Sequence, residues 1–313
     1  MARSRVRKHI LALILTGTCL GPVAASDDDR FAAVSASGRF IMDTAAAREQ
    51  MSPRETCEVT LDEIGLHAIT YAGQCLALDF VSYHGTDEVS FTSNFDGKVF
   101  FADPDSGAEL SSFTLNPANN GAFGNHEWNG MFFNDWSQWD RYFTDSDGIG
   151  WSTYDNPASN LGRGMDFDSV NQLVWETYSS TGLYAFGPTN SSGTFFDLSA
   201  WITSQMSGLA VFPDGAGTGI AVASYSSPQI LFFTFAEGAV TYAGCAVLPV
   251  TNPVEESFGL AYSENRRTFF WSYESTSGQR WLSELDPSGP GFSLIFGDGF
   301  ETGNTTGWSS SVP

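Results

Sequence analysis

Three short stretches in the second half of the chain share one pattern, namely GMDF (164–167), GLAV (208–211) and GLAY (259–262). Their first residues lie 44 and 51 residues apart, and turn residues and further apolar, aromatic-rich segments follow each of them. This spacing is typical of β-propeller blades, which are four-stranded antiparallel sheets. The repeat therefore predicts small sheets that pack face to face around a ring, so that each sheet shields its neighbours from water.

The remaining strands follow from alternating apolar segments between Gly, Pro, Asn and Asp turns. After the three openings we expect strands at 172–178, 182–188 and 194–198, at 219–225, 229–235 and 239–245, and at 268–274, 280–287 and 292–296. Upstream we expect strands near 67–73 and 74–80, at 88–94, 98–104 and 109–115, and in a block that opens at 130–133 and continues through 141–147 and 150–155. The last strand before the C-terminal tail is expected to pair with an early one and close the ring.

The predicted fold class is therefore all-β, with a single β-propeller of about five four-stranded blades over residues 57–296. A β-sandwich is the alternative, because it also combines alternating strands with Gly-rich turns. The blocks are too long for the coils of a β-helix. The hydrophobic content of 42% excludes a disordered chain.

Residues 1–25 resemble a secretory signal peptide in composition, with basic residues from Arg3 to Lys8, then an apolar run, and Val23-Ala24-Ala25 before the expected cleavage site at Ser26. An uncleaved membrane anchor would need about 18 or more apolar residues. We expect a secreted, periplasmic or cell-surface protein without membrane contact after cleavage. Residues 26–56 form a separate N-terminal segment with a short helix expected at 43–51.

The charge of the chain excludes several classes of partner. Four of the 14 basic residues lie in the leader, so the remaining chain carries 10 basic and 36 acidic side chains, a formal balance of −26. Such a polyanion repels nucleic acids and anionic lipids. We therefore expect an extracellular partner rather than DNA, RNA or a membrane, and a monomeric protein.

The C-terminal tail (297–313) contains Asp298-Gly299-Phe300-Glu301, Gly303, Thr305 and Trp308. It resembles the DGFESGxTSxW tail on many secreted proteins of Gram-negative bacteria such as the Xanthomonadales, although Thr302 replaces the usual Ser and Gly307 precedes the Trp. The resemblance implies export from a bacterium and no particular activity. The blade blocks also resemble generic secreted propellers with GLAY…LYELDP-like blades, a pattern that many functions share.

Cys57, Cys75 and Cys245 remain after removal of the leader. An odd number of cysteines in an oxidising compartment allows one intramolecular disulfide and one spare thiol. We predict a Cys57–Cys75 disulfide because these two are close in sequence, and it would stabilise the fold by about 3 kcal/mol. Cys245 lies in an apolar segment and is interpreted as a small buried side chain.

No familiar catalytic motif occurs in the sequence, and the candidate catalytic residues lie in and just after the segment GNHEWNG (124–130). His126 and Glu127 are adjacent, and Asp135 and Asp140 follow. A His beside carboxylates can act as a general base. The alternative is a loop His that is hydrogen-bonded to a turn carbonyl.

Three tryptophans of the same region are candidate ligand-binding residues. Trp128, Trp136 and Trp139 stand among Asn, Asp, Ser and Gln, a context typical of exposed loops. Exposed indole rings beside carboxylates and carboxamides suit stacking on sugar rings. The alternative is that they pack where two blades meet.

Calcium, as a structural ion, is the one cofactor that the sequence suggests. Asp103 and Asp105, and likewise Asp145 and Asp147, place carboxylates two residues apart in turns. Neither pair continues into a complete EF-hand loop. Asp is also common in turns for backbone reasons alone.

Taken together, these patterns predict an exported acidic propeller that acts as a binding or interaction module, for a glycan or another extracellular partner. The alternative function is a hydrolase or lyase with a His and carboxylates on the loop face of the propeller. A structural protein of the cell envelope without a discrete ligand is the third hypothesis. Fold alone does not decide between them.

Overall fold

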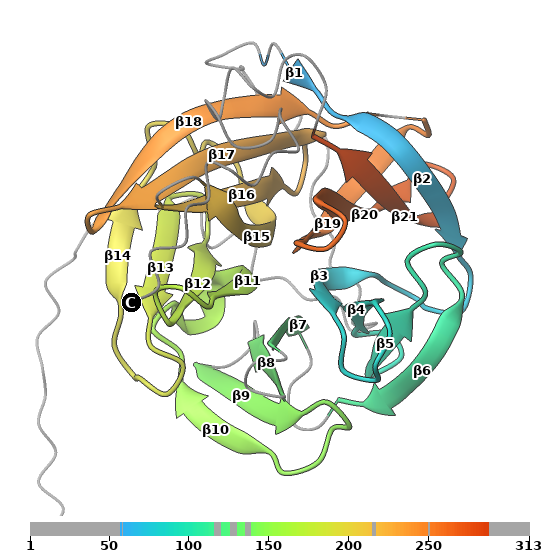
Figure 1. The fold of residues 1–313 in the computed structure, drawn as a ribbon, viewed down its shortest axis with the longest axis horizontal. Coiled ribbons are helices and arrows are strands. Elements are labelled where there is room, and N and C mark those ends of the chain that lie inside the picture. The colour runs from blue at the N-terminus through green and yellow to red at the C-terminus, as the bar shows by residue number, and fades with distance from the viewer. Residues whose placement is uncertain are drawn as a thin grey trace, which may run out of the picture. The chain divides into compact units, whose positions relative to one another are not determined.

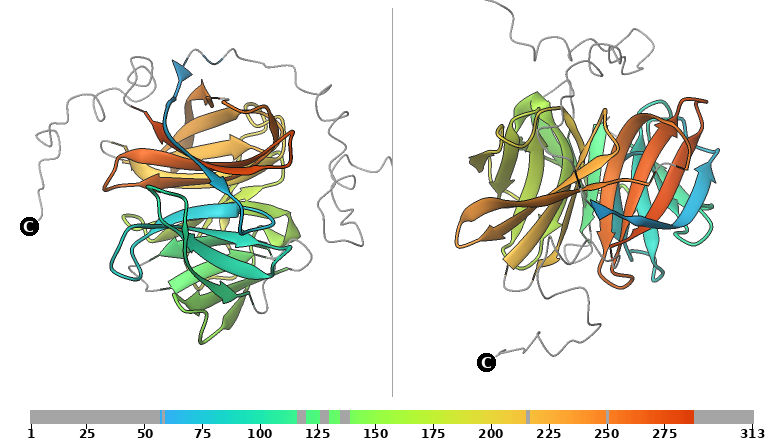
Figure 2. Two further views of the ribbon diagram at one scale, coloured as in Figure 1. Left: turned by 90° about the vertical axis from the view of Figure 1, so that its right-hand side faces the viewer. Right: turned by 90° about the horizontal axis from the view of Figure 1, so that it is seen from above.

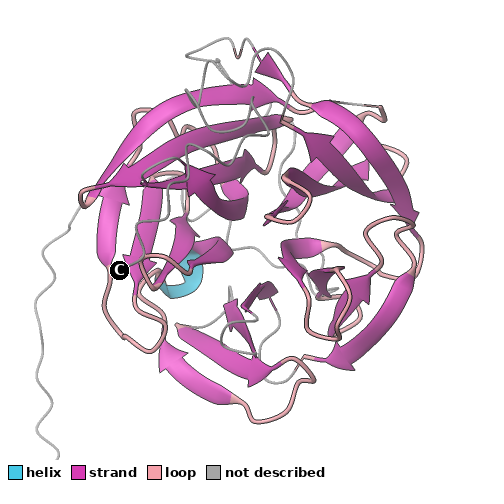
Figure 3. Cartoon of the chain, in the orientation of Figure 1, coloured by secondary structure: helices cyan, strands magenta, loops and turns pink. Residues whose placement is uncertain are grey.

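The computed structural model describes residue 57 and residues 59–115, 120–125, 130–134, 139–214, 217–249 and 251–287. The described strands form five sheets around a ring, and the described helical structure is one short 3-10 turn, η2 (Ser159–Leu161) (Figures 1 and 3). This arrangement confirms the predicted five-bladed β-propeller and excludes the β-sandwich. The side views in Figure 2 show neighbouring sheets standing beside one another.

Each blade is an antiparallel meander that begins at an inner strand. Blade 1 contains β3 (Leu76–Val81), β4 (Glu88–Ser93), β5 (Lys98–Ala102) and β6 (Glu109–Thr114), and blade 2 contains β7 (Asn120–Asn125), β8 (Gly130–Asn134), β9 (Asp140–Asp145) and β10 (Ser152–Asp155). Blade 3 contains β11 (Gly162–Asp168), β12 (Leu173–Tyr178), β13 (Gly182–Phe186) and β14 (Thr194–Asp197). Blade 4 contains β15 (Met206–Asp214), β16 (Gly217–Ser224), β17 (Gln229–Ala236) and β18 (Ala239–Val247), with β1 (Val59–Thr60) at its outer edge. Blade 5 contains β19 (Val254–Ser263), β20 (Thr268–Ser275), β21 (Arg280–Asp286) and, outermost, β2 (Asp62–Ile69).

Three details of the predicted strand order are wrong or untested. The second block does not open at Gly130, because β7 precedes it as the inner strand and β8 is the second strand. Residues 67–69 belong to β2 of blade 5 rather than to the first blade. The predicted strand at 292–296 lies outside the described residues.

The glycines of the repeated openings explain why the inner strands can lie close together. A Cβ atom added to Gly164 would lie 2.6 Å from the carbonyl carbon of Gly208, and one added to Gly208 would lie 2.5 Å from the amide nitrogen of Leu260. One added to Gly259 would lie 2.5 Å from the amide nitrogen of Leu78 in blade 1. The repeat therefore marks the positions where successive backbones meet around the centre of the ring.

The pairing of each inner strand with the second strand of its blade is interrupted by a shift in register. At two of these irregularities a hydroxyl accepts the backbone hydrogen bond that the ladder omits. The amide of Gly164 donates to Oγ1 of Thr177 at 3.1 Å, and the amide of Gly259 donates to Oγ of Ser272 at 2.9 Å. The bulges are thus hydrogen-bonded features of the blades.

The hydrophobic core is divided into clusters between neighbouring blades. Trp175 of blade 3 and Ile220 of blade 4 belong to one cluster, and Phe212 of blade 4 and Trp271 of blade 5 belong to another. Both tryptophans are fully buried. Because both faces of a blade need such a neighbour, the ring has to close for every blade to bury its apolar side chains.

Residue 57 and residues 59–69, which we call the closing segment, complete the ring and contact two blades in succession. β1 pairs in parallel with β18, with Val59 opposite Ala246, and β2 pairs antiparallel with β21, with Ile69 opposite Arg280. An early strand therefore completes the blade formed by β19, β20 and β21. The strand that was predicted to pair with it, at 292–296, lies outside the described residues.

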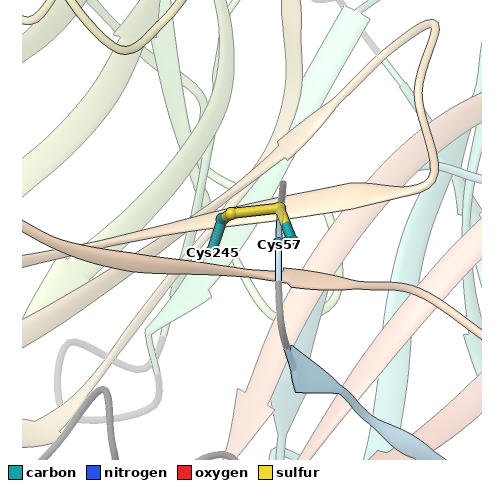
Figure 4. Close-up of a disulfide and its surroundings, with 2 residues drawn as sticks. All are labelled: Cys57 and Cys245. Carbon is teal, nitrogen blue, oxygen red and sulfur yellow. A yellow bond between two sulfur atoms is a disulfide. The ribbon is translucent and has the colours of Figure 1, made fainter. Parts of the chain in front are cut away.

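The predicted Cys57–Cys75 disulfide is wrong. Cys57 forms a disulfide with Cys245 of β18, 188 residues away in sequence, and Cys75 is a buried free thiol (Figure 4). The chain after residue 57 runs along the outer edges of blades 4 and 5 before it enters blade 1, so sequence proximity does not reflect distance in space. The disulfide fastens the closing segment to blade 4.

The predicted leader (1–25), the N-terminal segment up to residue 56 with its helix at 43–51, and the tail (297–313) lie outside the described residues. These assignments stay predictions. Within the described ranges, no helix has the length and apolar character needed to cross a membrane.

Candidate ligand-binding site

Most of the site residues predicted around residue 130 lie outside the described residues, namely His126, Glu127, Trp128, Asp135 and Trp136. Trp139 is described and its side chain is 70% exposed. Its carbonyl accepts a 2.8 Å hydrogen bond from the amide of Asn156. Asp140 begins β9, is half-buried and lies opposite Asp155 of β10. The proposed roles of these residues stay predictions.

The two predicted calcium turns already use their carboxylates within the chain. Oδ1 of Asp103 accepts hydrogen bonds from the amides of Asp105 and Ser106, at 2.8 and 3.0 Å. The carboxylate of Asp105 pairs with Nη2 of Arg266 at 2.7 Å. The first turn is therefore held by its own hydrogen bonds and by an ion pair to blade 5.

The second turn is similar. Oδ1 of Asp145 accepts hydrogen bonds from the amides of Asp147 and Ile149, at 3.1 and 2.7 Å, and Oδ1 of Asp147 lies 3.6 Å from Nε2 of His84. In the part of the chain that the structure describes, no three His, Cys, Asp or Glu side chains are grouped so that they could hold a metal ion. Calcium at either turn stays a prediction.

A pocket lies at the end of the ring where the inner strands of blades 3, 4 and 5 finish. Its volume is about 640 Å³, and we call it the rim pocket. Its apolar lining consists mainly of Phe167, Val170, Val211, Phe212, Pro213 and Phe235. Its polar lining includes Asp168, Asn171, Thr218, Glu237 and Glu264. The lining thus comes from the ends of β11, β15 and β17, the start of β16, and the turns that follow β11, β17 and β19.

The polar side of the rim pocket is braced by Asp168, which is only 2% exposed. Its Oδ1 accepts hydrogen bonds from the amides of Val170 and Asn171, at 3.0 and 2.9 Å. Its Oδ2 accepts from Nδ2 of Asn171 and from Oγ1 of Thr218, both at 2.7 Å. Because Thr218 belongs to blade 4, this carboxylate ties two blades together and holds the pocket in shape before any ligand arrives.

Asp166 of β11 immediately precedes Phe167 of the rim pocket and carries a perturbed carboxyl group. Burial raises its pKa to about 7, and the negative charges of Asp168 and Glu264 raise it further, although it accepts hydrogen bonds from the amides of Val211 (2.5 Å) and Phe167 (2.7 Å). Burial also raises the pKa of Asp214 at the end of β15. Acidic side chains from three blades, namely Asp168, Asp214 and Glu264, therefore lie toward this end of the ring.

Sequence reasoning missed the rim pocket because each of its residues resembles an ordinary turn residue. One signal was present: each repeated opening is followed within a few residues by an acid, Asp168 after Gly164, and similarly Asp214 and Glu264 in the next two blocks. Since the openings align around the ring, acids at similar offsets from them gather at one end.

A second group of buried polar residues lies between blades 2 and 3, toward the opposite end of the strands. Glu176 of β12 is fully buried, and its Oε1 accepts hydrogen bonds from Nδ2 of Asn134 and of Asn156, at 2.7 and 3.0 Å. Burial raises the pKa of Glu176 to about 7, although both amides and the charges of Arg141 and Arg163 lower it. Its Oε2 has no hydrogen-bond partner among the described residues.

No protein-family model matches this chain, and no curated protein of similar sequence was found. Among solved structures, the chain is similar to the glutaminyl cyclase of Myxococcus xanthus, with 15% identity, a TM-score of 0.55, and coverage of 74% of this chain and 99% of that one. It is also similar to virginiamycin B lyase of Staphylococcus aureus, with 12% identity, a TM-score of 0.42, and coverage of 72% and 75% of the two chains. An auxiliary nutrient binding protein of Bacteroides thetaiotaomicron gives 11% identity, a TM-score of 0.43, and coverage of 69% and 70%. At these identities the likeness to the cyclase shows the propeller fold alone.

Proposed function

We propose that this protein is an exported binding module that takes a ligand or partner into the rim pocket. The observation that carries the proposal is the pocket itself, with a volume of about 640 Å³, apolar walls and hydrogen-bonding groups at one end of the ring. Sites of this composition commonly bind small ligands or protruding side chains. The blades supply a rigid frame and the turns supply the contacts.

Three features support export. The leader at 1–25 and the tail at 297–313 have the patterns of secreted bacterial proteins. The Cys57–Cys245 disulfide fits an oxidising compartment. A secreted, periplasmic or cell-surface location follows from these features as part of the proposal.

A single substitution at the pocket mouth tests the binding role. Val170 lines the rim pocket and is 86% exposed, so Val170→Arg places a long cationic side chain there without disturbing the core. Ile149→Arg is the matched control, because Ile149 is also exposed and lies in blade 2. The full chain is applied to arrays of glycans and of peptides of varied charge.

We expect the class of compounds that binds the wild type to lose about tenfold or more in affinity with Val170→Arg and to bind Ile149→Arg as before. Binding that both variants retain in full would contradict the assignment of the rim pocket.

Glycan binding at the predicted tryptophan surface is a further proposal for this module, supported by the exposure of Trp139. The same glycan array tests it with Trp136→Ala and Trp139→Ala. Loss of glycan signal in either variant supports the surface, and undiminished signal in both removes it.

A hydrolase or lyase is the second candidate function. Burial raises the pKa of Glu176 to about 7, but this side chain is 0% exposed and lies away from the rim pocket, so the candidates for acid–base chemistry are the predicted His126 and Glu127. The Myxococcus glutaminyl cyclase shows that a propeller of similar fold can be an enzyme. We expect any turnover of the array-identified ligand, followed by mass spectrometry, to be lost in His126→Ala while affinity is kept. Turnover that survives this substitution would contradict a catalytic role for His126.

A further inference from the structure

We propose that the rim pocket binds a positively charged group on an apolar stem, such as the ammonium or guanidinium group of a Lys or Arg side chain on a partner protein. The inference rests on the proposed binding function and deepens it by naming the chemistry of the ligand.

The first step concerns charge. Asp168 and the exposed Glu237 and Glu264 line the rim pocket, and the described part of its lining contains no Lys, Arg or His. Glu237 and Glu264 form no ion pair with another described residue. Carboxylates gathered in a partly enclosed site repel one another, and a bound cation relieves that repulsion more effectively than a neutral ligand does.

The second step concerns the stem. Val211 and Pro213 are half-buried parts of the wall of the rim pocket, and the exposed Val170 stands at its mouth. The methylene groups of a Lys or Arg side chain can lie along such a wall while the charged end reaches the carboxylates. A bare metal ion or ammonium would leave these apolar contacts unused.

The third step separates this ligand from a sugar. Stacking on a sugar ring needs an open aromatic face, and the faces in the rim pocket are covered. Phe212 is 2% exposed, Phe167 is buried, and Phe235 packs against Trp175 and Phe196. In addition, Asp168 already accepts four hydrogen bonds from the chain. The carboxylates of Glu237 and Glu264 remain available, and they favour a cation.

The experiment compares three probes with the same stem and different heads, namely hexylamine, hexanol and hexanoate, by calorimetric titration of the full chain near neutral pH. A Lys-containing peptide and the same peptide with acetylated Lys distinguish a side chain of a partner from a free amine. The test variant is Glu237→Gln with Glu264→Gln. The control variant, Glu109→Gln with Asp155→Asn, removes two exposed acids from blades 1 and 2.

We expect protonated hexylamine to bind, hexanol to bind about tenfold more weakly and hexanoate not at all. The test variant should weaken hexylamine about threefold to tenfold and the control variant should not. The unmodified peptide should bind more tightly than hexylamine if a partner protein is the source, and acetylation should abolish its binding.

Equal binding of hexylamine and hexanol, or equal effects of the two double variants, would overturn the inference. Failure of every amine and peptide would overturn it as well. In these cases the proposed function still stands if Val170→Arg abolishes binding of the array-identified ligand, and it falls if Val170→Arg has no effect there.

Discussion

Gly208 of blade 4 lies so close to Leu260 of blade 5 that a Cβ atom at Gly208 would stand 2.5 Å from the amide nitrogen of Leu260. Real Cβ atoms essentially never approach backbone atoms this closely. The same contact recurs between blades 3 and 4, where Gly164 meets Gly208, and between blades 5 and 1, where Gly259 meets Leu78. The repeated glycine therefore sets how closely the inner strands approach around the ring.

We accordingly expect Gly208→Ala to lower the free energy of unfolding by about 3 kcal/mol or more, because two inner strands would have to separate. Gly278→Ala is the control. Its Cβ would meet nothing within 4 Å, although its φ of +80° is strained for Ala, so a loss of about 1 kcal/mol is expected. Denaturant unfolding measures both. Equal losses of unfolding free energy in the two variants would contradict the claim that Gly208 is required for the close approach of the inner strands.

The disulfide between Cys57 and Cys245 gives a second prediction. It closes a loop of 188 residues, so Cys57→Ser should destabilise the folded protein by about 3–5 kcal/mol. Cys75→Ala should leave the crosslink intact, and peptide mapping without reductant should identify a Cys57–Cys245 linked pair in both this variant and the wild type. A linked pair that contains Cys75 would refute the assignment.

Stability should depend on pH through Glu176, whose pKa is raised from 4.5 to about 7. A carboxyl group with a raised pKa binds protons more tightly in the folded state, so between these two values the unfolded chain holds fewer protons. Folding stability should therefore fall as pH rises from about 5 to about 8, on the order of 3 kcal/mol for this group.

The pKa of Asp166 is also raised, so this group changes stability with pH in the same direction as Glu176. The substitution Glu176→Gln separates the contribution of Glu176 from that of Asp166. We expect the variant to have a shallower dependence of unfolding free energy on pH and to gain stability relative to the wild type at about pH 8. Identical pH slopes in thermal or urea unfolding would show that Glu176 is charged at neutral pH in the folded protein.

A fourth prediction concerns the clusters between blades. Trp271 is fully buried, stacks on Tyr273 with ring centroids 4.3 Å apart, and donates a 2.9 Å hydrogen bond from Nε1 to Oγ of Ser257. Trp271→Ala should cost about 3–5 kcal/mol of stability. The half-exposed Trp201 provides the comparison, and Trp201→Ala should cost about 1 kcal/mol in the same urea titration. Similar costs would indicate that Trp271 is not in the core.

The blades were predictable because the signal of a blade is local. Gly164, Gly208 and Gly259 recur where inner strands meet, and the alternating segments between turns correspond to strands such as β12, β16 and β20. The strand β7, with the sequence NGAFGN, was missed because it lacks β-branched residues.

Contacts between distant parts of the chain were harder to predict from the sequence. The partner of Cys57 depends on which blades the closing segment contacts, and the sequence near Cys57 does not indicate those contacts. The rim pocket likewise unites Asp168 at the end of β11 with Glu237 and Glu264 from two turns, and only the closed ring brings these three residues together. The recurrence of an acid after each repeated opening is a sequence signal that could have indicated part of it, but no prediction used that signal.

Hydrogen exchange of the full chain, with and without a saturating concentration of the array-identified ligand, tests the binding account most directly. We expect slower amide exchange in the peptides that cover residues 167–171 and 208–214, which line the rim pocket, and no change in the peptide that covers 141–145 in blade 2. Protection confined to other segments, with residues 167–171 and 208–214 unchanged, would show that the ligand binds elsewhere on the protein.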